Sequence, residues 1–302
     1  MPQILVVGSL HYDIVVEAPH LPRRDETVIG SNVRFVCGGK GGNQAVAASR
    51  HGGDVAFTGA VGEDFFAEVL IANLHDAGVD VEHVVRTPEA ASGISMAIVE
   101  ETGDYGAVVA SGANRLIKPQ EVGVPHGITH LLLQNEIPEC VNLAASRQVR
   151  DRDTQVILNA APMLSMSDEL LDCVDLLIVN RLEAQELFGA PQDTLEQATM
   201  LLENLSILTE TVIVTLGGDG LVFRSGDAAP KAIPAHDVEV ISSHGAGDAF
   251  VGALCAKLAA DGGLEESLNY ASGAAALHVA TAVDERNKIG SEAVADFLKA
   301  SG

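Results

Sequence analysis

The chain alternates short apolar runs with segments in which apolar residues recur every three or four positions. Helical spacing is clearest at 43–50, closed by Gly52-Gly53, and from about 64 to 77, stopped by Gly78. Alternating strands and helices favour an α/β fold, with a central, mainly parallel sheet flanked by helices on both faces. The apolar runs that predict its strands stand at 4–7, 55–58, 130–134, 156–159, 176–179 and 212–216.

Two stretches interrupt this alternation. Residues from about 14 to 36 lack a helical pattern and are punctuated by Pro19, Pro22 and Gly30. Residues from about 92 to 110 predict a hairpin, with strands 94–99 and 105–109 around the turn Thr102-Gly103-Asp104. We expect one domain over 1–302, with a discontinuous β-sheet lid at approximately 12–36 and 92–112. The alternative is an extension of the sheet edge that does not open and close over a site.

The charge balance is strongly acidic, with a net charge of −24. Because basic stretches are also missing, neither nucleic acid nor an anionic membrane is expected as a partner. No apolar run is long enough to span a bilayer. The segment Met1-Pro2-Gln3 leads directly into an apolar run without the basic flank of a signal peptide. We therefore expect a cytoplasmic protein.

The motif Gly245-Ala246-Gly247-Asp248 stands directly before an apolar helical stretch at 249–258. Glycines let the backbone come close to a ligand, and a helix N-terminus turns unpaired N–H groups toward an anion. Asp248 adds a proton acceptor beside that anion. Phosphoryl transfer to an alcohol needs this combination of backbone dipoles and a carboxylate that orients the hydroxyl. Taken alone, the motif also fits a plain helix start.

A second glycine-rich loop, Cys37-Gly38-Gly39-Lys40-Gly41-Gly42-Asn43-Gln44, precedes the helix at 43–50. Such a run of glycines is entropically costly unless the backbone must approach a ligand. The hypothesis is a loop that contacts a polyhydroxy substrate through Lys40, Asn43 and backbone amides. A flexible turn with a surface lysine is the alternative.

Further motifs accompany these two loops along the chain. They are Gly8-Ser9-Leu10-His11-Tyr12-Asp13, Val61-Gly62-Glu63-Asp64, Ser111-Gly112-Ala113-Asn114, Gln134-Asn135-Glu136, Asn159-Ala160-Ala161-Pro162, Asn180-Arg181-Leu182-Glu183-Ala184 and Thr215-Leu216-Gly217-Gly218-Asp219-Gly220. Together with the two loops, they resemble the motifs of ribokinase and its relatives, the family of carbohydrate and nucleoside kinases. The resemblance covers essentially the whole chain, and the order and spacing of the motifs make it specific.

The resemblance implies a Rossmann-like ribokinase fold with a β-lid, and a homodimer formed through the lids. It also implies transfer of the γ-phosphoryl group of ATP, with Mg²⁺, to a primary hydroxymethyl group. Asp248 would be the base, and the backbone at Gly245, Ala246 and Gly247 would form the anion hole. Beside a helix N-terminus, the pKa of Asp248 is expected to stay low.

Further roles follow from the same resemblance. Asp13 would grip two vicinal sugar hydroxyls, as a carboxylate can. Asn180 and Glu183, three residues apart on a helix, would organise phosphate and hydrated Mg²⁺, with Glu183 acting through water. Other sugar contacts are assigned to His11, Gly39, Lys40, Asn43 and Glu136, and other nucleotide contacts to Thr215, Gly217 and Gly220.

The sequence departs from the family pattern at three places. His11 replaces the asparagine that usually faces the sugar, and an imidazole is bulkier and can be cationic. Ser242 stands where the family usually has an aspartate in the loop that binds an activating K⁺, so K⁺ is expected to stimulate little. The segment 283–287 replaces a glycine-containing segment that flanks adenine.

The leading hypothesis is an ATP-dependent kinase for ribose or a ribose-like pentose. A nucleoside kinase, for a substrate such as adenosine or pseudouridine, is the near alternative. A catalytically silent sugar-binding sensor is another, disfavoured by the intact Asp248 motif. A nucleotide-dependent dehydrogenase is disfavoured because Val6-Val7-Gly8-Ser9-Leu10 lacks the glycine pattern expected after the first strand.

Overall fold

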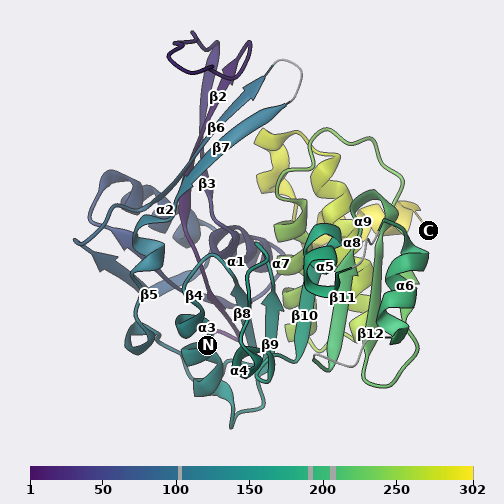
Figure 1. The fold of residues 1–302 in the computed structure, drawn as a ribbon. Helices are drawn as coiled ribbons and strands as arrows, with labels where there is room; N and C mark the ends of the chain where they lie inside the picture. The colour runs from purple at the N-terminus through teal and green to yellow at the C-terminus, as the bar shows by residue number, and fades with distance from the viewer. Residues whose placement is uncertain (101–103, 190–192, 205–208, 302) are drawn as a thin grey trace.

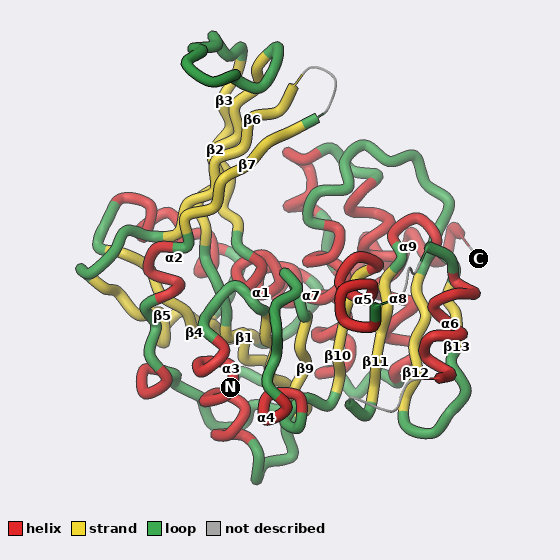
Figure 2. The backbone as a smooth tube through the Cα atoms, in the orientation of Figure 1, coloured by secondary structure: helices red, strands yellow, loops and turns green. Residues whose placement is uncertain are grey.

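The computed structural model describes residues 1–100, 104–189, 193–204 and 209–301 (Figures 1 and 2). The strands are β1 (Ile4–Val7), β2 (His11–Ala18), β3 (Asn32–Gly38), β4 (Val55–Gly62), β5 (Asp80–Thr87), β6 (Gly93–Glu100), β7 (Tyr105–Ala110), β8 (His130–Gln134), β9 (Gln155–Asn159), β10 (Leu176–Asn180), β11 (Thr211–Thr215), β12 (Leu221–Ser225) and β13 (Lys231–Ile233). The α-helices are α1 (Lys40–Arg50), α2 (Phe65–Asp76), α3 (Glu139–Val149), α4 (Asp168–Leu171), α5 (Arg181–Phe188), α6 (Leu195–Asn204), α7 (Ala246–Ala259), α8 (Leu264–Val279) and α9 (Ser291–Ser301). Short 3-10 helices are η1 (Gly112–Arg115), η2 (Pro119–Glu121), η3 (Gly217–Asp219) and η4 (Val283–Lys288).

The main sheet has the strand order β13-β12-β11-β10-β9-β8-β1-β4-β5. Neighbours from β11 to β5 pair in parallel, whereas β12 and β13 add an antiparallel edge. Alternate residues of one strand point to opposite faces. Ile4 and Val6 accordingly belong to one buried cluster, which also contains residues of α1, α2, α7, α8 and α9. Leu5 and Val7 belong to the other, with residues of α3, α4, α5 and α6.

A second sheet of order β3-β2-β6-β7 projects from the main body (Figures 1 and 2). The expected hairpin pairs β6 with β7 antiparallel, and β2 pairs with β3 in the same way. The central pair, β2 with β6, is parallel, so the projecting sheet is mixed. Thr102 and Gly103 of the expected turn lie outside the described residues.

The predicted fold class, a mainly parallel central sheet flanked by helices with a small additional sheet, is confirmed. The predicted strands are all present, with ends that differ by a few residues. In the described part of the chain, no helix has both the length and the apolar character needed to cross a membrane.

Candidate functional site

The site lies where several parallel strands of the main sheet end at the same edge. β8 runs into Glu136, β10 ends at Asn180 and β11 ends at Thr215. The N-terminus of α7 comes to the same edge, because Asn180, Thr215 and Asp248 line one pocket. Open α/β sheets place ligand crevices at this end of their strands.

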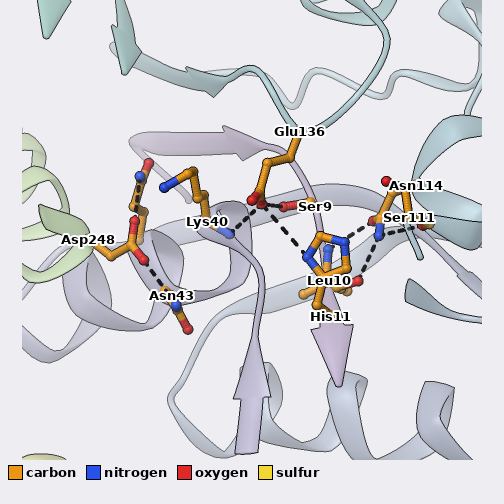
Figure 3. Close-up of polar contacts among 10 residues, drawn as sticks. Ser9, Leu10, His11, Lys40, Asn43, Ser111, Asn114, Glu136 and Asp248 are labelled. Carbon is orange, nitrogen blue, oxygen red and sulfur yellow. Dashed lines mark hydrogen bonds and ion pairs between the residues drawn. The ribbon is translucent and has the colours of Figure 1, made fainter. Parts of the chain in front are cut away.

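Asp248 is held by two amides of helix α1. Asn43 Nδ2 donates to Asp248 Oδ2 at 3.0 Å (Figure 3). Gln44 Nε2 donates to Asp248 Oδ1 at 2.9 Å. Gly245, with φ +78, is the residue before α7 and gives the backbone the left-handed turn that starts the helix. Both carboxylate oxygens therefore have a fixed direction relative to the helix N-terminus.

The pKa of Asp248 differs from the expectation. Burial raises it above its ordinary value, whereas Lys40 and the amides of Asn43 and Gln44 oppose the rise, and Glu136 adds to it. The expected low value was wrong in direction because packing against α1 removes solvent from the carboxylate. A raised pKa makes the carboxylate a better proton acceptor for a hydroxyl group.

A pocket of about 290 Å³ opens beside Asp248 and is lined by the predicted anion-hole residues Gly245, Ala246 and Gly247. Lys40, which was predicted to contact the sugar, belongs to the same lining. The Ala246 N–H donates to Ser243 O at 3.2 Å, so part of this turn is engaged within the loop itself. As a first-turn amide, the Gly247 N–H has no partner within the helix and is open to an anion.

A larger pocket of about 440 Å³ adjoins the first. The two share Thr215, Ser243, Gly247 and other residues, so a ligand can extend from one into the other. Apolar side chains line much of the larger pocket, and the turn at 217–220 closes it on one side. Predicted nucleotide residues in its lining are Thr215, Gly217 and Gly220.

Asp13 lies on the other side of Asp248, and the two line a cavity of about 260 Å³ together with Asn43. Gly38 leaves room for the Asp13 carboxylate, because a Cβ there would lie 2.2 Å from Asp13 Oδ2. Burial raises the pKa of Asp13 to about 6, Glu136 and Asp248 add to the rise, and a hydrogen bond from Ser95 opposes it.

Glu136 joins the first strand to the glycine-rich loop. Its Oε2 accepts hydrogen bonds from the Ser9 hydroxyl and, at 2.8 Å, from the Lys40 backbone N–H (Figure 3). Gly39, with φ +87, is the residue before α1 and lies against the backbone of Ser9 and His11. A Cβ at this position would lie 2.8 Å from Ser9 O and His11 N. This close approach gives the glycine a local structural reason beside its predicted sugar contact.

His11 is almost fully buried, with Nδ1 3.8 Å from Glu136 Oε2. Burial lowers its pKa and outweighs the raising effect of Glu136. A cationic imidazole, considered from the sequence, is therefore disfavoured at neutral pH. The ring packs beside Gly93, where an added Cβ would lie 2.5 Å from His11 Cδ2.

Asn180 and Glu183 form a reciprocal cap at the start of α5. Asn180 Oδ1 accepts from the Glu183 N–H at 2.9 Å, and Glu183 Oε2 accepts from the Asn180 N–H at 2.8 Å. Both residues also line the 290 Å³ pocket, where Lys40 lowers the pKa of Glu183 against the larger raising effect of burial. Among the described residues no group of three or more His, Cys, Asp and Glu could hold a metal ion. A single carboxylate is the kind of protein group through which a hydrated Mg²⁺ is usually bound.

The family pattern of the pfkB carbohydrate kinases matches residues 1–284. The chain belongs to this family. A ribokinase of Bacillus subtilis is 33% identical over 283 residues, which are 92% of this chain and 93% of the relative. A deoxyribokinase of Salmonella typhi is 29% identical, with 89% of each chain covered. The structure of Arabidopsis thaliana ribokinase complexed with ribose and ATP superposes with a TM-score of 0.91 at 28% identity, covering 99% of both chains.

The protein is therefore a sugar kinase, an ATP-binding transferase of the ribokinase type, as the motifs predicted. Of the predicted residues, Asp13, Asn43 and Asp248 line one region, and Lys40, Asn180, Glu183, Thr215 and the turn at 245–248 line the other. Gly217 and Gly220 line only the larger pocket, whereas His11, Gly39 and Glu136 line none of the three. Gln44 lies in the glycine-rich loop but had no predicted role, and Ser95 was not among the predicted site residues. The sequence signal that could have identified Ser95 as a site residue is its position as a polar residue between two apolar ones in a predicted strand, Ile94-Ser95-Met96.

Proposed function

We propose that this kinase transfers the γ-phosphoryl group of ATP to the primary hydroxymethyl group of ribose or a ribose-like pentose. The observation that carries the proposal is the position of Asp248, which two amides fix between the Asp13 cavity and the Lys40 pocket. Relatives named ribokinase, at about the same similarity from bacteria to plants, support ribose as the first sugar to test. The match to a deoxyribokinase favours 2-deoxyribose as the second candidate.

In the proposed reaction, Asp13 accepts hydrogen bonds from two sugar hydroxyls and turns the hydroxymethyl group toward Asp248. The hydroxymethyl oxygen forms a bond to the γ-phosphorus while the bond from that phosphorus to the β-γ bridging oxygen breaks. The proton passes to Asp248, and ADP leaves. The Gly247 N–H and the Lys40 ammonium stabilise the charge on the moving phosphoryl group.

Magnesium fits the proposed site as a hydrated ion bound mainly to the phosphates of ATP. Glu183 would orient its water molecules, and the ion would neutralise part of the phosphate charge when bound. A monovalent activator is not part of the proposal, because Ser242 brings no carboxylate to the loop before the anion hole.

The projecting sheet supports the further proposal of a homodimer. Phe35, Ile14, Met96 and Val108 are register partners across its four strands and therefore share one face. Phe35, Met96 and Val108 are 58%, 55% and 73% exposed. Asp13 and Ser95, one residue away in the register, face the opposite side toward the site. A second copy of this sheet would cover the apolar row.

The test is ADP release with Mg·ATP on D-ribose, 2-deoxyribose, fructose, 2-keto-3-deoxygluconate, adenosine, inosine, cytidine and pseudouridine. We expect turnover on a pentose and, for Asp248→Asn, a loss of roughly 10²–10⁴-fold in kcat, the scale of a positioned acid–base group. Asp76→Asn, an exposed aspartate at the end of α2, is the matched control. Turnover confined to nucleosides would mean that the substrate is a nucleoside and not a free pentose. An Asp248→Asn variant as active as the wild type would show the assignment of the base to be wrong.

A further inference from the structure

A buried arginine holds the loop that leads into the proposed anion hole. Arg286 lies in η4 and is 8% exposed. Each of its three side-chain nitrogen atoms donates to a different backbone carbonyl: Nη2 to Ser242 O at 2.6 Å, Nη1 to His244 O at 2.8 Å and Nε to Thr281 O at 3.2 Å. Two of these carbonyls belong to the loop before α7, and the third follows α8.

Other hydrogen bonds of this loop come mainly from its own backbone. The Ile241 and Ser242 N–H groups donate to Val279 O at 2.8 and 3.2 Å, and the Ala246 N–H donates to Ser243 O at 3.2 Å. His278 Nε2 lies 3.0 Å from His244 O. His244 is followed directly by Gly245, whose φ of +78 sets the direction of the backbone into α7. The His244 carbonyl therefore belongs to the peptide unit directly before the turn into α7, two peptide units before the one that carries the Gly247 N–H.

Three carbonyl oxygens that converge on one point create a concentration of negative partial charge. Carbonyl oxygens are the ligands that hard cations prefer, and without a positive charge the three would repel one another. Here the charge is attached to the chain, because the Arg286 guanidinium occupies the position and its planar fork meets all three oxygens. Arg286 also lines the cavity that contains Asp13 and Asp248.

We infer that Arg286 is a positioning residue whose guanidinium acts as a fixed internal cation, ordering loop 242–245 and through it the anion hole. The inference rests on the proposed role of Gly245–Gly247 in phosphoryl transfer. It would give this loop, which contains Ser242-Ser243 and no carboxylate, a positive charge that belongs to the chain itself.

The experiment compares Arg286→Ala, Arg286→Gln and Arg286→Lys in a tetramethylammonium buffer, with and without added K⁺ or guanidinium at constant ionic strength. For the wild type we expect kcat to stay within about twofold whichever cation is added. For Arg286→Ala we expect a kcat roughly 10²-fold lower, the low end of the loss seen when an oxyanion-hole donor is removed, with the sugar KM little changed. Added guanidinium or K⁺ should restore part of the kcat, and Arg286→Lys should retain more than Arg286→Gln.

Arg224→Ala is the matched control. Arg224 lies on β12, and its guanidinium also donates to backbone carbonyls, Leu202 O at 2.5 Å and Gly226 O at 3.2 Å. It should leave kcat unchanged and respond to no cation. Full activity of Arg286→Ala, or a loss that no cation restores, would overturn the inference. If Arg286→Ala does not fold, equal activity of the Lys and Gln variants would overturn it as well. A wild type that is inactive on every sugar would instead refute the proposed function. Calorimetric measurement of ADP binding to each variant shows whether the nucleotide site is intact, and so distinguishes failure of the inference from failure of the proposed function.

Discussion

Asp13 and Asp248 are two carboxylates in one cavity, with partners of different kinds. Two side-chain amides hold Asp248, whereas Asp13 has the Ser95 hydroxyl and the neighbouring charges of Glu136 and Asp248. Because burial and like charges act together on Asp13, its pKa rises to about 6. Its proposed role as an acceptor for sugar hydroxyls requires the ionised form.

The KM for the sugar should therefore rise as the pH falls through 6. A raised pKa means that Asp13 is protonated below about 6 and ionised above it, so sugar binding should weaken by up to about tenfold per pH unit below that value. The measurement is the sugar KM between pH 7.5 and 5, with circular dichroism to show that the fold persists. Asp13→Asn serves as the control, since its weaker binding should lose this pH dependence. A KM that is constant across the range would contradict the assignment.

Helices α1 and α7 bring the site together at the scale of elements. Gly252 lets them approach closely, since a Cβ there would lie 2.5 Å from Ala47 Cβ and 2.6 Å from Gln44 O. The same contact places Asn43 and Gln44 against Asp248, about one turn earlier on α7. Both helices contain small residues, which permit a close crossing. The sequence alone, however, does not tell which helices meet.

Gly252→Ala should push α7 away from α1. We expect a loss of about 1–3 kcal/mol in the free energy of unfolding, as for overpacking, and a fall in kcat because the amide contacts to Asp248 lengthen. Denaturant unfolding and steady-state kinetics measure the two effects.

Gly263→Ala is the control for kcat, because nothing lies within 4 Å of a Cβ at this position and its φ is −62. Since Gly263 is the N-cap of α8, this variant should lose some stability but keep the wild-type kcat. Equal kcat for the two variants would contradict the proposed crossing geometry.

The whole molecule is a covered main sheet with a second sheet that projects from it (Figure 1). The projecting sheet turns Asp13 and Ser95 toward the site and presents an apolar row on its other face. Exposed apolar rows of this kind mark interaction surfaces. Because each chain carries a net charge of −24, mutual repulsion opposes association most at low ionic strength.

Met96→Glu should weaken the proposed dimer, because a charge would then lie in the centre of the apolar row. Size-exclusion chromatography with light scattering at about 150 mM salt, where the Debye length is roughly 8 Å, should show a dimer for the wild type and a shift to monomer for the variant. Leu182→Glu, at an exposed apolar residue on α5, should leave the mass unchanged. A monomeric wild type would contradict the proposal.

The sequence by itself determined the class of the fold, the strands of the central sheet and the family. Apolar periodicity is a local property, and the glycine motifs need special backbone geometry wherever they occur, so both can be read along the chain. The antiparallel edge β12-β13 and the parallel pairing of β2 with β6 depended on tertiary structure. So did the contacts of Asp248 with residues some 200 positions away, its raised pKa and the three carbonyl bonds of Arg286. Burial and long-range hydrogen bonds arise only when distant segments pack together, and no local pattern encodes them.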